Sequence, residues 1–494
     1  MVTTILVILI GILLLMAAFV LVRMVLFSQS SDTSYLESKA SLPDFAVDPK
    51  VIASHLSAAI KVETISHEDV AMDDTGKFKV LHSLLAKQYP LVHATLKKEL
   101  VDGFSLLYTW KGTNEALDPV VFMAHQDVVP AEEHTLAQWT HPPFSGEIAD
   151  GFIWGRGTLD IKCQVIGILE AIEHLLHNNF KPERTIILAF GHNEEVLGSG
   201  AKEIVAHLKK KGVHVQSVID EGGSIYDNFI PGIKGLAATI GVAEKGYLSL
   251  KLKVEVKGGH SSTPSADTAI GILSRAIDRL QNHRFPAYPR AIVPMFKGFG
   301  AAASPLMQLA FSNLWLFSGL VKAKLASNPE TDATIRTTTA PTIIKGGIKD
   351  NVLPSLAEAV VNFRLLPGET IASVCDHVRK VIGDERVAFE PMPDKAWEAS
   401  PVSPTGANAY QHIASVVEEL FPGTAVAPYN MLGGTDSRNF CEISEQVYRF
   451  SPVVTTAEDI HRVHGVNECI SLEAMHKEAE FFYRLIPRWA STNM

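Results

Sequence analysis

Residues 119–127 read Pro-Val-Val-Phe-Met-Ala-His-Gln-Asp, an apolar run that ends abruptly at His125 and Asp127. A short apolar run flanked by turn residues is typical of a buried central strand. In open α/β sheets the reactive groups lie just beyond the carboxyl ends of such strands. A histidine at that place is a natural metal ligand, and an aspartate two residues later can orient it. One such pair is weak by itself, so its meaning depends on the residues found at the ends of the other strands.

The same arrangement, an apolar strand followed by polar groups, recurs further along the chain. The polar groups concerned are Asp160, the pair Glu194 and Glu195, Asp220, and His464. Each group has a simpler interpretation: an aspartate before a helix can cap it, and adjacent glutamates can lie in a solvated loop. Together, however, they place two histidines and several carboxylates at one edge of one sheet. Such mixed sets suit zinc, and two ions about 3.5–4 Å apart can activate a water molecule.

Helical and strand patterns alternate from about residue 48 to residue 240, which indicates a mostly parallel sheet covered by helices on both faces. Residues 161–178, for example, are predicted to form a helix with an apolar stripe that includes Ile166, Leu169 and Ile172. Near Gly241 the pattern changes, because residues 247–256 alternate polar and apolar side chains as a half-solvated sheet does. We therefore predict an α/β catalytic domain in two parts, residues 48–240 and 393–494. A small α+β domain is predicted as an insertion at residues 241–392.

The N-terminus is apolar and long enough to cross a membrane. Residues 1–22 carry no charged side chain, and the apolar character continues past Arg23 to Phe27. About 20 apolar residues suffice for a helical crossing, whereas a secretory signal normally has a basic start and a shorter apolar region. We expect residues 1–27 to be a retained membrane anchor, with a cleaved signal and a secreted protein as the alternative. Residues 28–47 are expected to be a tether that holds the catalytic domain outside the cytoplasm.

Composition argues against several classes of protein. The net charge is −10 and the basic residues are scattered, so no nucleic-acid partner is expected. The four cysteines are far apart and form no C-x-x-C motif, which argues against a zinc ribbon or a disulfide scaffold. The absence of any Asn-x-Ser/Thr sequon disfavours passage through a glycosylating compartment. The glycine-rich stretch at residues 155–160 lacks the third glycine of a dinucleotide-binding loop.

Residues 285–330 are predicted to form a long irregular stretch. Its part from Phe296 to Asn328 is unusually apolar, with Trp315 and Phe317 among several closely spaced apolar side chains. Core or dimer packing is the simpler explanation. The alternative is an apolar surface near the site that accepts an acyl chain or touches the membrane.

These motifs resemble those of the aminoacylase/carboxypeptidase family of co-catalytic two-zinc metallopeptidases. The resemblance runs from about residue 50 to the C-terminus. It rests above all on Met123-Ala-His-Gln-Asp-Val-Val-Pro130, His141-Pro-Pro-Phe-Ser-Gly146 and His464-Gly-Val-Asn-Glu468. Within the family the chain is most similar to Gly-X carboxypeptidases and to the secreted N-fatty-acyl-amino-acid synthase/hydrolases. The resemblance implies a zinc-dependent amide hydrolase acting on small peptides or N-acyl amino acids with a free carboxylate, with the reverse condensation possible at the same site.

The resemblance also implies a role for each candidate residue of the metal site. Five ligands would hold two Zn²⁺ ions, for which Co²⁺ or Mn²⁺ can substitute: His125 and Asp220 for one ion, Glu195 and His464 for the other, and Asp160 between them. Glu194 would be the general base, and Asp127 would fix the tautomer of His125.

The inserted domain is implied to be a ferredoxin-like lid that also forms a homodimer. His260 would polarise the scissile carbonyl, often from the partner subunit, while Asn351 and Arg364 would bind the substrate. Gly434 and Arg438 would belong to a loop near the substrate carboxylate, which an arginine fork can pair in bidentate fashion.

The alternative hypothesis, from another class, is a membrane-tethered, non-catalytic metal-binding scaffold of the same fold. The presence of every expected ligand and of Glu194 argues against it. Metal-dependent turnover would separate the two hypotheses.

Overall fold

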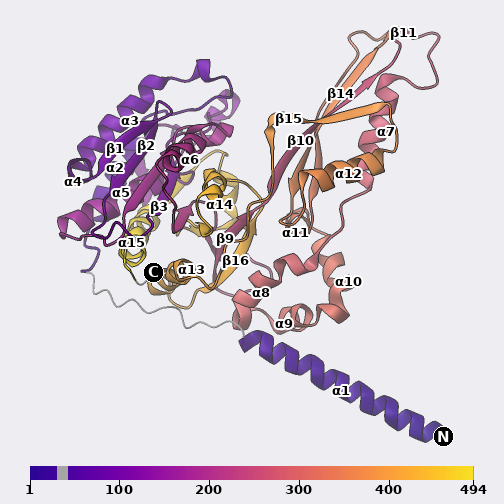
Figure 1. Ribbon diagram of the computed structural model, residues 1–494, viewed down its shortest axis with the longest axis horizontal. Coiled ribbons are helices and arrows are strands. Elements are labelled where there is room, and N and C mark those ends of the chain that lie inside the picture. The colour runs from indigo at the N-terminus through magenta and orange to yellow at the C-terminus, as the bar shows by residue number, and fades with distance from the viewer. Residues whose placement is uncertain (30–42, 493–494) are drawn as a thin grey trace.

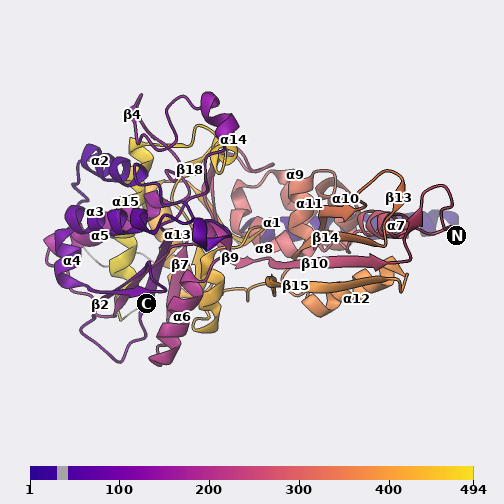
Figure 2. The same cartoon turned by 90° about the horizontal axis from the view of Figure 1, so that it is seen from above.

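The computed structural model describes residues 1–29 and 43–492, which form three parts (Figure 1). The N-terminal helix α1 (Val2–Gln29) projects as a separate rod, a large α/β domain forms one end of the molecule, and a smaller domain extends from it. Seen from above, the two domains lie end to end, and α1 points in the same direction as the smaller domain (Figure 2).

One sheet organises the large domain, with the strand order β1-β2-β6-β3-β7-β17-β9-β8-β18 and β16 paired with β9. The central pairs β6–β3, β3–β7 and β7–β17 are parallel, which confirms the prediction of a mostly parallel sheet. β3, β6 and β7 are buried along their whole length because helices cover both faces. The strands are β1 (Lys97–Val101), β2 (Ser105–Trp110), β3 (Val120–His125), β6 (Ile186–Gly191), β7 (Ser217–Asp220), β8 (Ile225–Asp227), β9 (Leu236–Glu244), β16 (Ala425–Met431), β17 (Val447–Arg449) and β18 (Val454–Thr455).

The helices of the large domain pack on alternate residues of these strands. One face meets α2, α5, α13 and α15, and the predicted apolar stripe of α5, with Ile166, Leu169 and Ile172, is fully buried there. The other face meets α6, which contributes Ile204 and Leu208. The helices are α2 (Pro49–Ile60), α3 (Thr75–Gln88), α4 (Pro90–Thr95), α5 (Lys162–His177), α6 (Gly200–Lys210), α13 (Asn408–Leu420), α14 (Ala457–Arg462) and α15 (Leu472–Trp489). A small sheet beside the main one contains β4 (Ile148–Ala149), β5 (Phe152–Trp154) and β19 (Cys469–Ser471).

The smaller domain has the predicted ferredoxin-like topology. Its antiparallel sheet has the order β12-β14-β10-β15, and α7 and α12 pack against one face of it. The alternating pattern of β10 is explained by that packing, since Leu248, Leu250 and Leu252 point into the core and the residues between them are more exposed. The elements are β10 (Gly246–Glu255), α7 (Ala269–Asn282), β12 (Thr338–Gly346), β14 (Leu356–Leu365), α12 (Ile371–Ile382) and β15 (Val387–Trp397), with the short pair β11 (Gly259–His260) and β13 (Val352–Leu353) at the far end.

The stretch predicted to be irregular is helical, so that prediction was wrong. Between α7 and β12 lie two short 3-10 helices and four α-helices, α8 (Val293–Phe299), α9 (Pro305–Ser312), α10 (Leu314–Leu325) and α11 (Pro329–Ile335). We refer to residues 289–335 as the helical insert. Pro294, Pro305 and Pro329 occupy the first turn of their helices, where a missing N–H costs nothing.

Helix α1 is the one described helix long and apolar enough to cross a membrane. Most of its side chains are exposed, and its C-terminal end packs on the helical insert, where Phe27 is buried with Phe296 and Phe311. This helix fits an anchor or a signal peptide. The predicted tether, residues 28–47, lies largely outside the described residues.

The chain passes between the large sheet and the small sheet twice, at adjacent points. It leaves the large sheet at the end of β9 and enters the small sheet at the start of β10, and it returns after β15. The backbone N–H of Ser400 donates to the carbonyl of Glu244 at 3.1 Å, and the N–H of Glu244 donates to the Ser400 hydroxyl at 2.8 Å. The outgoing and returning segments are therefore hydrogen-bonded to each other at the neck.

Candidate active site

Polar side chains gather where three neighbouring parallel strands end. His125 is the last residue of β3, Glu194 and Glu195 follow β6, and Glu221 follows β7. Since β3 lies between β6 and β7, the carboxyl ends of these strands bring the side chains to one edge of the sheet. Of the predicted site residues, His125, Glu194 and Glu195 lie at this edge.

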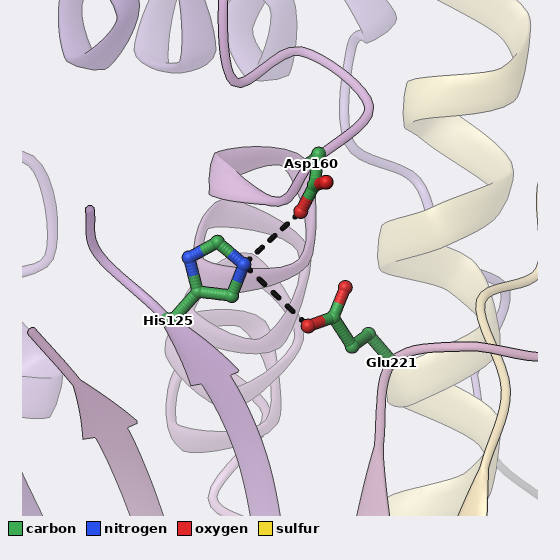
Figure 3. Close-up of side chains that lie close together, drawn as sticks. All are labelled: His125, Asp160 and Glu221. Atoms are coloured by element: carbon green, nitrogen blue, oxygen red, sulfur yellow. Dashed lines mark hydrogen bonds and ion pairs between the residues drawn. The ribbon is translucent and has the colours of Figure 1, made fainter. Parts of the chain in front are cut away.

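The first group of candidate ligands contains His125, Asp160 and Glu221 (Figure 3). Nε2 of His125 lies 3.0 Å from Oδ1 of Asp160 and 3.5 Å from Oε1 of Glu221. Asp220, the predicted ligand, is in neither candidate group among the described residues; its Oδ2 instead accepts the backbone N–H of Ser437 at 3.0 Å. The structure thus places Glu221, the residue after Asp220, beside His125.

The second group contains Asp160, Glu195 and His464. Nε2 of His464 lies 3.0 Å from Oδ2 of Asp160 and 3.0 Å from Oε2 of Glu195. Asp160 therefore directs one oxygen at each histidine and is common to both groups. The residue comes from the loop just before α5, and His464 comes from the turn after α14.

Asp127 and Glu194 lie directly beside these groups. Nδ1 of His125 hydrogen-bonds the backbone carbonyl of Asp127 at 3.0 Å, and one carboxylate oxygen of Asp127 lies 3.4 Å away. The Asp127 carboxylate also accepts the backbone N–H of Glu194 at 3.1 Å and that of Glu195 at 3.2 Å. One buried carboxylate thus fixes the His125 ring and the backbone that carries the two glutamates.

The crowding of carboxylates shifts the ionisation of the whole cluster. Burial raises the pKa of Glu194, and the neighbouring Asp436, Asp127 and Glu195 raise it further. Hydrogen bonds to Asp160 and Glu195 raise the pKa of His464 to about 10. Burial alone would raise the pKa of Asp160, but its hydrogen bonds with both histidines lower it instead. Glu194 and His464 therefore hold protons at positions where the positive charge of a metal ion would also be favourable.

The donor set fits divalent metal ions. Two imidazole nitrogens and the oxygens of three carboxylates form two sets, and within each set the donor atoms lie within 4.8 Å of one another. The buried Oε1 of Glu195 has no hydrogen-bond partner among the described residues, as expected of an atom reserved for a ligand. Imidazole and carboxylate donors suit zinc and the neighbouring transition metals.

A buried glutamate that the sequence analysis assigned no role shapes the loop that carries Asp160. Oε1 of Glu468 accepts the backbone N–H groups of Gly157, Leu159 and Asp160 at 2.9, 2.8 and 3.2 Å. Its other oxygen pairs with Nη1 of Arg156 at 2.7 Å. Its position four residues after His464 was the available signal, since the motif that begins at His464 ends on it.

A second buried ion pair holds the loop at residues 433–438. Nε of Arg449 lies 2.7 Å from Oε1 of Glu244, and the same oxygen accepts hydrogen bonds from the hydroxyls of Thr435 and Ser437. Gly434 lies in this loop. A Cβ atom added to Gly434 would lie 3.6 Å from Oε2 of Glu244. The loop is thereby tied to β9, which leads into the smaller domain.

Arg364 and Arg438 stand at the two ends of an aromatic stack at the neck between the domains. The rings of Tyr247 and Trp397 are stacked, with centroids 4.6 Å apart. The Arg364 guanidinium lies 4.5 Å from the centroid of the Tyr247 ring, and that of Arg438 lies 4.9 Å from the Trp397 ring. Arg364 belongs to β14 of the smaller domain, whereas Arg438 belongs to the large domain, so cation–π contacts link the two.

His260 and Asn351 lie elsewhere. They belong to the β11–β13 end of the smaller domain, which is remote from the large domain (Figure 1), and the backbone N–H of Ser261 donates to the carbonyl of Asn351 at 3.2 Å. Both side chains are exposed. Within one chain the structure therefore does not bring these two predicted substrate-binding residues to the candidate metal ligands.

Comparison with known proteins identifies the family. The family model "Peptidase family M20/M25/M40" matches residues 121–488. The chain is 40% identical to the N-fatty-acyl-amino acid synthase/hydrolase of Homo sapiens, covering 87% of this chain and 86% of the relative. It is 38% identical to "Probable carboxypeptidase S-like 2" of Dictyostelium discoideum, covering 88% and 84%.

Solved structures share the fold. An M20 family metallo-carboxypeptidase from Sulfolobus solfataricus superposes with a TM-score of 0.65 at 17% identity, covering 89% of this chain and 99% of that one. A dinuclear metal-binding M20 peptidase from Bacillus subtilis gives a TM-score of 0.55 at 14% identity, covering 88% and 98%. The family is metal-dependent, typically with a dinuclear centre. The chain belongs to peptidase family M20/M25/M40 and is a hydrolase of the metallopeptidase or amidohydrolase type.

Proposed function

We propose that this enzyme uses two zinc ions to hydrolyse the amide bond of small peptides or N-acyl amino acids that carry a free carboxylate. The observation that carries the proposal is the carboxylate of Asp160, whose two oxygens lie 3.0 Å from the Nε2 atoms of His125 and His464. A shared carboxylate between two histidine-containing groups is the arrangement that two neighbouring divalent ions require.

We assign His125, Asp160 and Glu221 to one ion, and Asp160, Glu195 and His464 to the other. Glu221 replaces Asp220 in the predicted set because it is the carboxylate that faces His125. The donor chemistry also suits Co²⁺ or Mn²⁺. When bound, the two ions would lower the pKa of a water molecule and polarise the scissile carbonyl.

We assign the proton transfers of the reaction to Glu194. Its raised pKa fits a group that takes a proton from water and later delivers it to the leaving amine. Asp127 contributes by position: its contacts with His125 and with the Glu194 N–H orient both groups. Neither role requires Asp127 to exchange a proton.

The substrate carboxylate would bind at the neck. Gly434 and Arg438 belong there to the loop whose Asp436 neighbours Glu194, and Arg364 of the lid lies at the other end of the stack of Tyr247 and Trp397. A guanidinium fork suits bidentate pairing with a carboxylate. The position of the smaller domain supports a lid role for it, since this domain is joined to the large domain at the neck (Figure 2).

His260 and Asn351 would act on the site of a second subunit in a homodimer formed through the lid. The exposed lid strand β12 supports this proposal, because it is an edge strand with Ile343 and Ile344 largely exposed. Sedimentation of wild-type protein and of an Ile343→Lys/Ile344→Lys variant tests it. A monomeric wild-type protein with full activity would contradict it.

Membrane attachment through α1, with the catalytic domain outside the cytoplasm, is part of the same proposal. The burial of Phe27 among apolar residues of the helical insert supports retention of the helix, because cleavage would expose that cluster. Fractionation of cells and N-terminal sequencing of the mature protein distinguish an anchor from a signal.

The test of the proposed reaction is release of free amino acid by the zinc-loaded enzyme from a dipeptide, an N-acetyl amino acid and an N-oleoyl amino acid. Glu194→Gln is the control, since it keeps the shape of the side chain and removes the base. We expect turnover by the wild type alone, and the preferred substrate identifies a peptidase or an acylase. Zinc-loaded wild-type protein without turnover on any of the three would favour the non-catalytic scaffold.

A further inference from the structure

The helical insert differs in charge from the rest of the chain. Residues 285–329 contain Arg290, Lys297, Lys322 and Lys324 but no aspartate or glutamate, although the whole chain has a net charge of −10. All four basic side chains are exposed, so packing does not account for them. This part of the insert is therefore a cationic patch on an acidic protein, which favours an anionic partner.

The same insert exposes large apolar side chains. The exposed fractions are 75% for Leu306 in α9, and 49%, 46% and 70% for Trp315, Leu316 and Leu320 in α10. Clustered exposed apolar residues mark an interaction surface, and tryptophan beside lysines is typical of the boundary between lipid and water. The apolar stretch thus has two sets of side chains, since Phe296 and Phe311 are buried in the core while this second set is exposed.

The apolar surface is continuous with α1. The side chain of Asn313 donates to the carbonyl of Val20 at 3.2 Å, and Nε of Arg23 donates to the carbonyl of Ser312 at 2.9 Å. The rings of Phe19 and Trp315 are 6.2 Å apart. Helices α9 and α10 lie on the side of the molecule from which α1 departs (Figure 1). A bilayer crossed by α1 therefore meets this surface.

A groove of about 940 Å³ separates α1 from α8 and α10. Its apolar walls include Leu26 and Val293, and its cations are Arg23, Arg290 and Lys297. Within the described part of the chain, none of these three cations pairs with a carboxylate. An apolar cleft whose lining includes cations without a carboxylate partner matches a phospholipid, which combines acyl chains with an anionic headgroup.

We propose that the helical insert lies in the surface of the bilayer that α1 crosses, and that the groove binds the headgroup of an anionic phospholipid. The proposal goes beyond hydrolysis and does not depend on it; it depends on the retention of α1. In this arrangement α1 and the insert form two membrane contacts that fix the orientation of the catalytic domain against the bilayer.

The first test places a fluorescent reporter on α10. The full chain is reconstituted into vesicles of phosphatidylcholine and phosphatidylglycerol with brominated acyl chains, which quench nearby indoles. Two variants are compared, Trp315→Phe/Leu320→Trp and the matched control Trp315→Phe/Ile348→Trp, whose new indole is at a fully exposed lid position. We expect bromine to quench the indole introduced at position 320 but not the one at 348. Equal quenching of the two would refute the bilayer contact.

The second test addresses the headgroup. Bromine is placed on phosphatidylglycerol only or on phosphatidylcholine only. Because the chain has six tryptophans, the part of the quenching that disappears in Trp315→Phe is the part that reports which lipid occupies the groove. Each basic residue near an anionic surface is worth roughly fivefold, the fold-change that corresponds to about 1 kcal/mol. Arg290→Gln/Lys297→Gln should therefore remove most of a preference for phosphatidylglycerol, while the matched variant Lys322→Gln/Lys324→Gln should keep it.

Three outcomes count against the groove. A wild-type protein without lipid preference would overturn it, as would an equal loss in both double variants, which would indicate diffuse attraction. Retention of the preference in Arg290→Gln/Lys297→Gln would have the same meaning. An unchanged circular dichroism spectrum and unfolding midpoint verify that each variant is folded, and this check does not depend on the proposed hydrolysis.

Discussion

Replacing Glu221 by glutamine should remove one of the two metal ions and leave the other. In the structure the Glu221 carboxylate is one of three donors in the group of His125, 3.5 Å from its Nε2. A neutral amide keeps the shape but not the charge. Loss of a residue that only orients a ligand costs 10–100-fold in metal affinity, so loss of a direct ligand should exceed about 100-fold, or about 2.7 kcal/mol.

The assay is bound zinc per chain after dialysis against a buffered zinc concentration between the two expected dissociation constants. Wild type should retain two ions and Glu221→Gln one. Asp220→Asn is the matched control: it removes the charge of an adjacent buried carboxylate whose Oδ2 accepts the Ser437 N–H, so two ions should remain. Two ions in Glu221→Gln together with one in Asp220→Asn would refute the ligand assignment and make Asp220 the ligand instead.

Further predictions concern the base, the buried pairs and pH. Glu194→Gln should lower kcat by 10²–10⁴-fold with two zinc ions still bound, as measured by amino acid release and metal analysis. Glu468→Gln should destabilise the protein by about 3–5 kcal/mol in chemical unfolding, because it leaves the buried Arg156 without its charge partner at 2.7 Å; an unchanged midpoint would contradict the role given to Glu468. Burial raises the pKa of Glu478 from its unfolded-state value of about 4.5 to about 8. The protonated side chain therefore contributes its full stability below about pH 4.5. As the pH rises to about 8, that contribution falls by about 1.4 kcal/mol per pH unit. Glu478→Gln should flatten that slope between pH 5 and pH 8; an identical slope in variant and wild type would count against it.

The fold could be predicted from the sequence wherever periodicity was strong. The buried strand ending at His125 and the apolar stripe of α5 are as predicted, because burial on both faces leaves a continuous apolar run and burial on one face leaves a helical repeat. The helical insert was predicted to be irregular. Its helices are short, from 7 to 12 residues, and three of them have a proline in the first turn, Pro294, Pro305 and Pro329, where proline is favoured.

The choice between Asp220 and Glu221 shows the limit for the site. Both residues lie at the end of one apolar strand, and side chains on a strand alternate between faces, so a one-residue difference decides which carboxylate meets His125. Sequence alone offers no measure of where β7 stops pairing. The structure places Glu221, and not Asp220, 3.5 Å from Nε2 of His125, while Oδ2 of Asp220 accepts the backbone N–H of Ser437 in the loop that comes after β16.

The hydrogen bonds between Glu244 and Ser400 bear on how the chain folds. About 155 residues separate the two halves of the large domain at this neck, and closing a flexible loop of that length costs about 4–5 kcal/mol in chain entropy. The lid sheet already pairs Tyr247 with Trp397, a few residues from either end of the excursion. A lid that forms first therefore brings the two halves of the catalytic domain together, whereas a lid that forms late leaves each half to find the other across a long, unstructured loop.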